Sequence, residues 1–353
     1  MADAITPGPD YDAALWGAAV GIRRERRFLG VTGKAPGDML NGLLTNSLPL
    51  PFGEEERGMV RGSVVYSALL TPKGKMITDL RSFRDPTDGF VLDLPGVGAE
   101  EAMAHFKKFL PPRLAKVEDR SGELALMTLL GPEAPALLAE VASRMGLPGT
   151  VEEMVDLVEG EEILVPSRGS EPFRVTRNGE SHAAGWDLLL SWPSAEELRD
   201  RLDSVGAIPL TEASLEILRV EKGRPAFGKD MKQDTIPTEA GIQRRAIDHQ
   251  KGCYTGQEVI IRIRDRGHVN KELRGFLLGE TSPPASGHEL FKPGREKSVG
   301  WITSAVVSPA FSQTIALGYL QRGVELAEEV RLGSVDGPQV QACALSDEGW
   351  VLD

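Results

Sequence analysis

The sequence predicts a mixed α+β protein with a smaller all-β unit at its C-terminal end. Its 353 residues suggest two or three domains. Strand-like and helix-like segments alternate up to about residue 270, whereas short strand patterns separated by Gly, Pro and Ser prevail beyond Lys271. We therefore expect a region 1–270, with internal boundaries near 50, 120 and 205, and a small β-sandwich or barrel over 271–353.

The first half of the larger region shows both periodicities. Apolar residues recur at helical spacing in two segments, and Thr71-Pro72-Lys73-Gly74-Lys75 is typical of a hairpin turn between two strands. The predicted elements, in order, are a strand at 28–31, a helix at 36–44, strands at 64–70 and 76–83, a strand at 90–94 and a helix at 100–110.

The second half of the larger region shows the same alternation of strand and helix patterns. Pro132 suits a first helical turn, Asn178-Gly179 indicates a tight turn, and Ser194-Ala195-Glu196-Glu197 is a capping box that opens a helix. The predicted strands are 124–130, 163–166, 173–177 and 187–192. This order suits a ferredoxin-like split unit.

The C-terminal unit contains five predicted strands and a Ser/Pro-rich loop at 281–287. The strands are 273–278, 299–303, 314–320, 330–332 and 340–345. Their short, regular spacing is the mark of a small sandwich or barrel.

Composition excludes several classes of protein. With 41% hydrophobic and 26% charged residues, the chain is typical of a soluble globular protein. No apolar run approaches the ~20 residues that span a bilayer, and the N-terminus lacks a leader pattern, so we expect a cytoplasmic protein that does not bind membranes. The two cysteines, Cys253 and Cys343, are too few for a disulfide framework, and no spacing offers a complete metal site.

The charge distribution is uneven. A formal net charge of −12 argues against direct DNA binding, yet residues 244–274 carry eight basic and four acidic side chains. This local charge of +4 leaves −16 for the rest of the chain. The basic segment can attract an anionic ligand, or it can be an ordinary solvated strand edge.

The octapeptide Lys251-Gly252-Cys253-Tyr254-Thr255-Gly256-Gln257-Glu258 is the strongest local signal. It places a thiol beside an ammonium group that can favour the thiolate, between glycines that permit unusual backbone angles. The alternative is a tight turn before a β-branched strand at 259–261, with Cys253 as a small buried hydrophobe.

The octapeptide resembles the signature of the YgfZ family, folate-binding relatives of the glycine-cleavage T-protein that are linked to iron-sulfur protein maturation. Other stretches resemble the same superfamily in the expected order, so that the similarity covers most of the chain. They are 33–38, 44–46, 70–80, 218–225, 236–241, 300–305 and 316–319. The resemblance implies two ferredoxin-like lobes plus a small C-terminal β-barrel, arranged around a central channel that binds tetrahydrofolate or a folate derivative.

The resemblance also implies polar groups that hold the folate. Asp79, Arg219 and Glu221 are candidates, with salt bridges at strand edges as the alternative. Two departures from the T-protein pattern stand out. Its hairpin ends in two adjacent acids where this chain has Thr78-Asp79, and its Gly-Glu segment, which holds the pterin, corresponds loosely to 184–187, where no Glu occurs.

Within the octapeptide, Cys253 is the candidate functional thiol because a soft thiolate can engage iron or sulfur. Lys251 is expected to lower the pKa of that thiol or to contact a folate carboxylate. Tyr254, Gln257 and Glu258 are expected to line or fix the site. Two histidines outside the octapeptide, His249 and His268, can be bases but are more typical of surface or capping residues.

Three hypotheses follow. The leading one is a folate-binding accessory protein that supports assembly or repair of iron-sulfur proteins, with indirect effects on tRNA modification. Its partners would be folate and iron-sulfur client or assembly proteins. The alternative is a tetrahydrofolate-dependent aminomethyltransferase of the T-protein type, and the third is an interaction module without a ligand.

Overall fold

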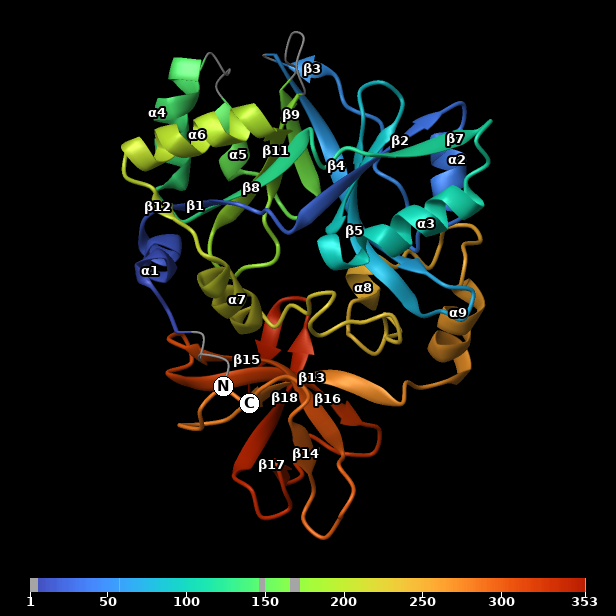
Figure 1. The fold of residues 1–353 in the computed structure, drawn as a ribbon, viewed down its shortest axis with the longest axis vertical. Coiled ribbons are helices and arrows are strands. Elements are labelled where there is room, and N and C mark those ends of the chain that lie inside the picture. Colours follow the sequence, from blue (N-terminus) through green and yellow to red (C-terminus); the bar gives the residue numbers. More distant parts are fainter. Residues whose placement is uncertain (1–5, 57, 146–149, 166–171, 353) are drawn as a thin grey trace.

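The computed structural model describes residues 6–56, 58–145, 150–165 and 172–352 (Figure 1). A curled sheet with its helices forms the upper part of the molecule in this view, and a second sheet at the C-terminal end forms the lower part. This arrangement agrees with the predicted α+β class.

One long sheet runs through both halves of the larger region. Its neighbouring strands pair antiparallel except β1 and β12, which pair in parallel. The strands, in spatial order, are β12 (Ile208–Pro209), β1 (Ala19–Ile22), β8 (Leu124–Leu130), β11 (Gly185–Ser191), β10 (Phe173–Arg177), β9 (Glu161–Val165), β4 (Met59–Leu70), β5 (Met76–Arg84), β6 (Phe90–Pro95), β2 (Arg26–Gly33) and β7 (Ala115–Asp119). The short β3 (Glu55–Glu56) pairs with β4. Pairing between β9 and β4 joins the two lobes.

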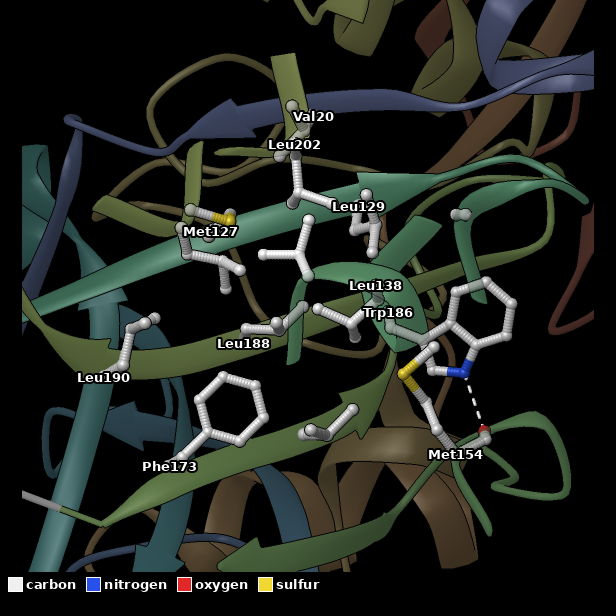
Figure 2. Close-up of a cluster of buried hydrophobic side chains, with 14 of the residues drawn as sticks. Val20, Met127, Leu129, Leu138, Met154, Phe173, Trp186, Leu188, Leu190 and Leu202 are labelled. Atoms are coloured by element: carbon white, nitrogen blue, oxygen red, sulfur yellow. Dashed lines mark hydrogen bonds between the residues drawn. The ribbon is translucent and has the colours of Figure 1, made fainter. Parts of the chain in front are cut away.

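Each lobe covers the outer face of its half-sheet with helices. In the first lobe, three helices lie on β2, β5 and β7; they are α2 (Pro36–Asn41), η1 (Gly96–Gly98) and α3 (Ala99–Phe109). In the second lobe, three helices enclose an apolar core with the strands β8, β9, β10 and β11; they are α4 (Ala134–Met145), α5 (Thr150–Val155) and α6 (Trp192–Ser204). Figure 2 shows this core, in which the Trp186 indole N–H donates to the Met154 carbonyl at 2.7 Å.

The C-terminal sheet closes on itself, which confirms the predicted barrel. Its strands are β13 (Lys271–Leu277), β14 (Glu289–Phe291), β15 (Gly300–Ser308), β16 (Gln313–Gln321), β17 (Val330–Leu332), β18 (Gln339–Ser346) and β19 (Gly349–Val351). They pair in the order β13-β16-β15-β14-β17-β18, and β18 pairs back with β13. The closure removes the exposed sheet edges that a short open sheet would leave.

Four further helices connect these parts: α1 (Pro9–Trp16), α7 (Glu212–Glu221), α8 (Gln243–Ala246) and α9 (Gln257–Arg266). In Figure 1, α7 lies between the second lobe and the barrel. Residues of α1, α7, β15 and β16 share one apolar cluster, so the barrel is packed against the lobes.

Several local predictions differ from the structure. The helix predicted at 36–44 ends at Asn41, and Gly42 is its C-cap. Residues 259–261 form part of α9 and not a strand. The connection after Asn178 is a loop of several residues, because β11 starts only at Gly185. Trp192 belongs to α6, because Ser191 caps this helix by accepting from the Ser194 amide, so that the helix begins before the predicted capping box. Residue 166, the predicted end of one strand, lies outside the described residues.

Candidate functional site

The inner face of the curled sheet carries polar side chains from both lobes. Neighbouring residues of a strand point to opposite faces, so Asp79 and Arg81 of β5 share one face, and Thr78 and Leu80 share the other. Leu80 packs in the core beneath α3. Arg81 donates to Asp187 of β11, in the second lobe, with an Nη1 to Oδ2 distance of 2.6 Å. The inner face therefore lies between the lobes.

A buried ionic network fixes the side chains of this interior. Arg81 also donates to Asp93 at 2.6 Å, and Arg26 donates to the other oxygen of Asp93 at 2.7 Å. Although burial raises the pKa of Asp93, the guanidinium groups of Arg26 and Arg81 outweigh it and hold this pKa below its usual value. Thr128 supports Asp187 with a 2.7 Å hydrogen bond. Each charge in the network thus has a counter-charge.

Asp79 is different, because only one of its oxygens has a partner. Oδ2 accepts a 2.7 Å hydrogen bond from the Tyr66 hydroxyl. Oδ1 is buried and has no hydrogen-bond partner among the described residues. Burial raises the pKa of Asp79, against the lowering effects of Tyr66 and Arg26. An unsatisfied buried oxygen costs about 1–3 kcal/mol, so this atom is suited to accept from a ligand or a water.

Arg245 holds the ring of Tyr66 in place. Its guanidinium carbon lies 4.9 Å from the ring centroid, and its Nη2 donates to Glu159 at 2.6 Å and to Glu180 at 3.2 Å. A stacked guanidinium with two carboxylate partners restricts the orientation of the ring beneath it. Burial and the neighbouring Asp79 raise the pKa of Tyr66 well above its usual value, so its hydroxyl remains a donor.

A pocket of about 310 Å³ lies between the segment 223–245, which follows α7, and the barrel. Its lining comes from residues 223–225, the stretch 238–245, the first strand of the barrel and the turn at 345–347. Four arginines line it, namely Arg224, Arg244, Arg245 and Arg274. Arg245, which also stacks on Tyr66, is the residue that this pocket shares with the surroundings of Asp79. Three members of the basic segment therefore line this pocket, whereas the arginines of α9 are exposed.

Cys253 is exposed, so the interpretation of this residue as a small buried hydrophobe is wrong. The turn after it depends on Gly256, whose φ is +86° and which precedes α9. A Cβ at Gly256 would lie 2.6 Å from the Thr71 carbonyl oxygen of the hairpin turn. A close approach at a left-handed backbone position requires glycine. The hairpin turn and the octapeptide are thus packed against each other.

Lys251 anchors the octapeptide. Its ammonium group donates to the main-chain oxygens of Leu44 at 2.8 Å and Asn46 at 2.7 Å, and it lies 5.6 Å from the ring centroid of Tyr254. Burial lowers the pKa of Lys251 to about 8 and raises that of Tyr254 to about 12. The hydrogen bonds of Lys251 therefore attach the octapeptide to the main chain of residues 44–46.

The other predicted residues of this region lie at the surface or close to it. Gln257 and Glu258 form the first turn of α9, with Gln257 half-buried and Glu258 exposed. His249 and His268 are exposed as well. Among the described residues, the side-chain hydrogen bond to Asp79 comes from Tyr66 and not from any of these four residues.

Arg219 and Glu221 of α7 are committed to other parts of the protein. The five guanidinium N–H groups of Arg219 match five hydrogen bonds, to both oxygens of Glu216, to Asp230, to Ser304 and to the Arg224 carbonyl. Glu221 accepts from Tyr11 of α1 at 2.9 Å and from Ser308 of the barrel. These two residues tie the lobes to the barrel, and the structure does not bring them to Asp79.

Three residues of the interior escaped the sequence analysis: Tyr66, Arg81 and Asp187. Strand alternation places Tyr66 and Arg81 on the same face of the hairpin as Asp79. Polar residues at even spacing from Asp79 along the two paired strands are therefore the signal that identifies both. Asp187 lies in the segment 184–187, which corresponds to the Gly-Glu segment of the T-protein pattern.

Among the described residues, no group of three or more His, Cys, Asp or Glu side chains is placed to hold a metal ion. No helix in the described ranges is long and apolar enough to cross a membrane.

The fold and this interior define a protein of the glycine-cleavage T-protein class. Residues 27–251 match the GCVT N-terminal domain, and residues 271–345 match the glycine cleavage T-protein C-terminal barrel domain. The chain belongs to this family. The matches establish the T-protein family as a whole and do not single out the YgfZ branch.

Curated relatives carry the name aminomethyltransferase. The protein from Rubrobacter xylanophilus is 28% identical over 270 residues, which cover 76% of this chain and 69% of the relative. That from Thermosynechococcus vestitus is 27% identical over 303 residues, or 84% and 77% of the two chains. The crystal structure of glycine cleavage system aminomethyltransferase T from Bartonella henselae superposes with a TM-score of 0.79 over 97% of this chain and 90% of that one. Its identity of 21% supports the shared fold.

Proposed function

We propose that the chain binds a reduced folate in the polar interior between its lobes. The observation that carries this proposal is Oδ1 of Asp79, a buried acceptor without a partner among the described residues. A pterin presents ring N–H and amino donors to such an acceptor, and membership of the T-protein family favours this ligand class. Bound there, folate would supply the one-carbon acceptor chemistry of the family.

The adjoining pocket suits the other end of the same ligand. Folates end in one or more glutamate carboxylates, and Arg244 and Arg274 line the pocket next to Arg245. We assign no ligand contact to Arg219, because its donors are already paired with protein groups. The roles of Tyr254, Gln257 and Glu258 toward folate are limited to supporting the segment that borders the hairpin.

Isothermal titration with tetrahydrofolate under anaerobic conditions tests this proposal. Asp79→Ala should weaken binding by about tenfold or more, since it removes an acceptor that the ligand satisfies. Asp200→Ala, at an exposed position of α6, is the matched control and should bind as the parent does. Failure of the parent protein to bind any reduced folate would refute the proposal.

The names of the relatives favour aminomethyl transfer as the use of this folate. The position of Thr78 supports this activity. Thr78, which replaces the first acid of the T-protein pair, lies on the face of β5 opposite to Asp79 and packs against η1, where a Cβ at Gly98 would lie 2.4 Å from its hydroxyl. The acid that faces the interior is retained. Turnover with the aminomethylated carrier protein of glycine cleavage tests this activity.

A specific observation favours the second candidate, an accessory role in assembly or repair of iron-sulfur proteins. The octapeptide with the YgfZ-type pattern presents the Cys253 thiol at the surface, where a partner protein can reach it. T-protein sequences carry no such cysteine at this place. Complementation of a strain without its own YgfZ-type protein, scored by a four-iron-cluster enzyme, tests this role.

The two candidates predict different variants to fail. Aminomethyl transfer requires Asp79 and tolerates Cys253→Ser, whereas the accessory role requires the thiol. If Cys253→Ser retains full turnover and the parent chain does not complement, the protein is an aminomethyltransferase. If the parent chain complements without turnover and Cys253→Ser does not complement, it is an accessory protein.

A further inference from the structure

Asn46 lies where three segments of the chain meet. Its side-chain amide donates to the carbonyl of Tyr66 on β4 at 3.0 Å and to the carbonyl of Arg245 on α8 at 2.9 Å. Its own carbonyl accepts from Lys251 at 2.7 Å. One residue therefore contacts the strand that supports Asp79, the helix that supports the stacked arginine, and the segment that carries Cys253.

The stretch around Asn46 is joined firmly to the same elements. The Thr45 hydroxyl donates to the Ala246 carbonyl at 2.6 Å, and the Thr45 amide donates to the Ala68 carbonyl at 3.1 Å. Lys251 adds a second hydrogen bond, to the Leu44 carbonyl. Thr45 is fully buried, so its own hydrogen bonds are shielded from water.

The path from Asn46 to the interior consists of two contacts. Tyr66 donates its hydroxyl to Asp79, and Arg245 lies on the ring of Tyr66. A ligand that bonds to Oδ1 of Asp79 meets the same carboxylate that the Tyr66 hydroxyl contacts. The main chain of Tyr66 is bonded to the Asn46 side chain, and the main chain of Asn46 to Lys251, so hydrogen bonds join the interior to the anchor of the octapeptide.

We propose that Asn46 is a positioning residue that couples the folate site to the exposed Cys253 segment, with Lys251 as the receiving contact. This proposal rests on the proposed folate binding and deepens it. Folate bound in the interior changes how accessible the Cys253 thiol is to a partner protein. Linkage makes the effect reciprocal for binding, so that a partner bound at the Cys253 segment changes folate affinity by the factor by which folate changes the affinity for that partner.

The test measures how fast iodoacetamide alkylates Cys253 in a Cys343→Ser background, with and without saturating 5-formyltetrahydrofolate. Titration calorimetry on the same sample reports folate binding separately. We expect folate to change the alkylation rate by about fivefold or more. If folate binds and the rate stays the same, the coupling does not exist.

Four variants locate the coupling. Asn46→Asp keeps the shape of the side chain and loses both N–H donors, so folate should still bind without changing the alkylation rate. Ser47→Ala is the matched control, because Ser47 bonds Asp248 at 2.5 Å and its side chain contacts neither Tyr66 nor Arg245; it should keep the full effect. Lys251→Met should abolish the effect, and Lys251→Arg, which retains N–H donors, should restore it. A folate effect that survives in Asn46→Asp would overturn the assignment.

A folate-independent measurement separates this proposal from folate binding itself. Hydrogen exchange of the β4 amides should accelerate near Tyr66 in Lys251→Met and remain at the parent rate in Lys251→Arg. Equal exchange in the parent, Lys251→Met and Lys251→Arg would refute the link even if no reduced folate binds, and faster exchange in Lys251→Met alone would support it.

Discussion

The Tyr66 hydroxyl donates to one carboxylate oxygen of Asp79 at 2.7 Å and leaves the other oxygen buried without a partner in the described structure. This hydrogen bond satisfies one oxygen of the buried carboxylate. The other oxygen has lost its hydration and gains no hydrogen bond in exchange, which costs folding free energy.

Asp79 should destabilise the ligand-free protein as pH rises. Burial raises its pKa above the usual 3.8, so the folded state holds the proton to higher pH than the unfolded chain does. The stability associated with the protonated group is complete below pH 3.8 and is lost as pH rises through the raised pKa. Asp79→Asn, which cannot ionise, should therefore melt higher than the parent, by a margin that grows with pH. Melting temperatures across pH for both proteins and for Asp200→Asn check this; a constant margin would contradict it.

Lys251 should show the opposite pH dependence. Burial lowers its pKa from 10.5 to about 8, so between these values the unfolded chain binds a proton that the folded chain does not. The stability of the parent should rise across this window relative to that of Lys251→Met. Lys73→Met, at an exposed position of the hairpin turn, is the control and should follow the parent. Parallel melting curves for the parent and Lys251→Met would show that this amine is not desolvated.

Gly256→Ala should destabilise the protein by about 1–3 kcal/mol, because the backbone there is left-handed and the new Cβ would meet the Thr71 carbonyl. Gly252→Ala offers a matched control within the octapeptide, since a Cβ at Gly252 has open space around it. Urea unfolding of both variants measures the difference. Equal losses would mean that the contact between the hairpin turn and α9 does not govern stability.

Cys253→Ser should leave the melting temperature and folate affinity unchanged, because the thiol is exposed and fills no core position. Only complementation of iron-sulfur enzymes should fail if the accessory role is correct. Cys343 is buried on β18 and should be dispensable for complementation and folate binding. A lower melting temperature for Cys253→Ser would restore the packing interpretation.

Polyglutamylated folate should bind more tightly than the monoglutamate, and added salt should reduce the difference. Arg274→Gln removes one of the pocket arginines and should shrink the advantage of the longer tail. Arg264→Gln, on the exposed face of α9, should leave it intact. Equal affinities for both folates at low ionic strength would contradict an electrostatic role for the pocket.

Local sequence patterns are sufficient to predict many of the secondary-structure elements. β17 was predicted at 330–332 and occurs at Val330–Leu332, and the hairpin of β4 and β5 forms around its predicted turn. These elements follow from alternation and turn residues, which act over a few positions along the chain. The octapeptide was found in the same way, because its residues are adjacent.

Tertiary structure decided the rest. Val259-Ile260-Ile261 has the composition of a strand, yet it is helical, because the left-handed Gly256 starts a helix whose Ile260 is buried in the core beside the hairpin. Strand alternation put Thr78 and Asp79 on opposite faces, but only the packing of η1 and of the second lobe showed which face is the interior. The contact of Asn46 with Lys251 joins residues 205 positions apart, a separation at which no local pattern operates. A partner at that distance is selected by the way the whole chain packs.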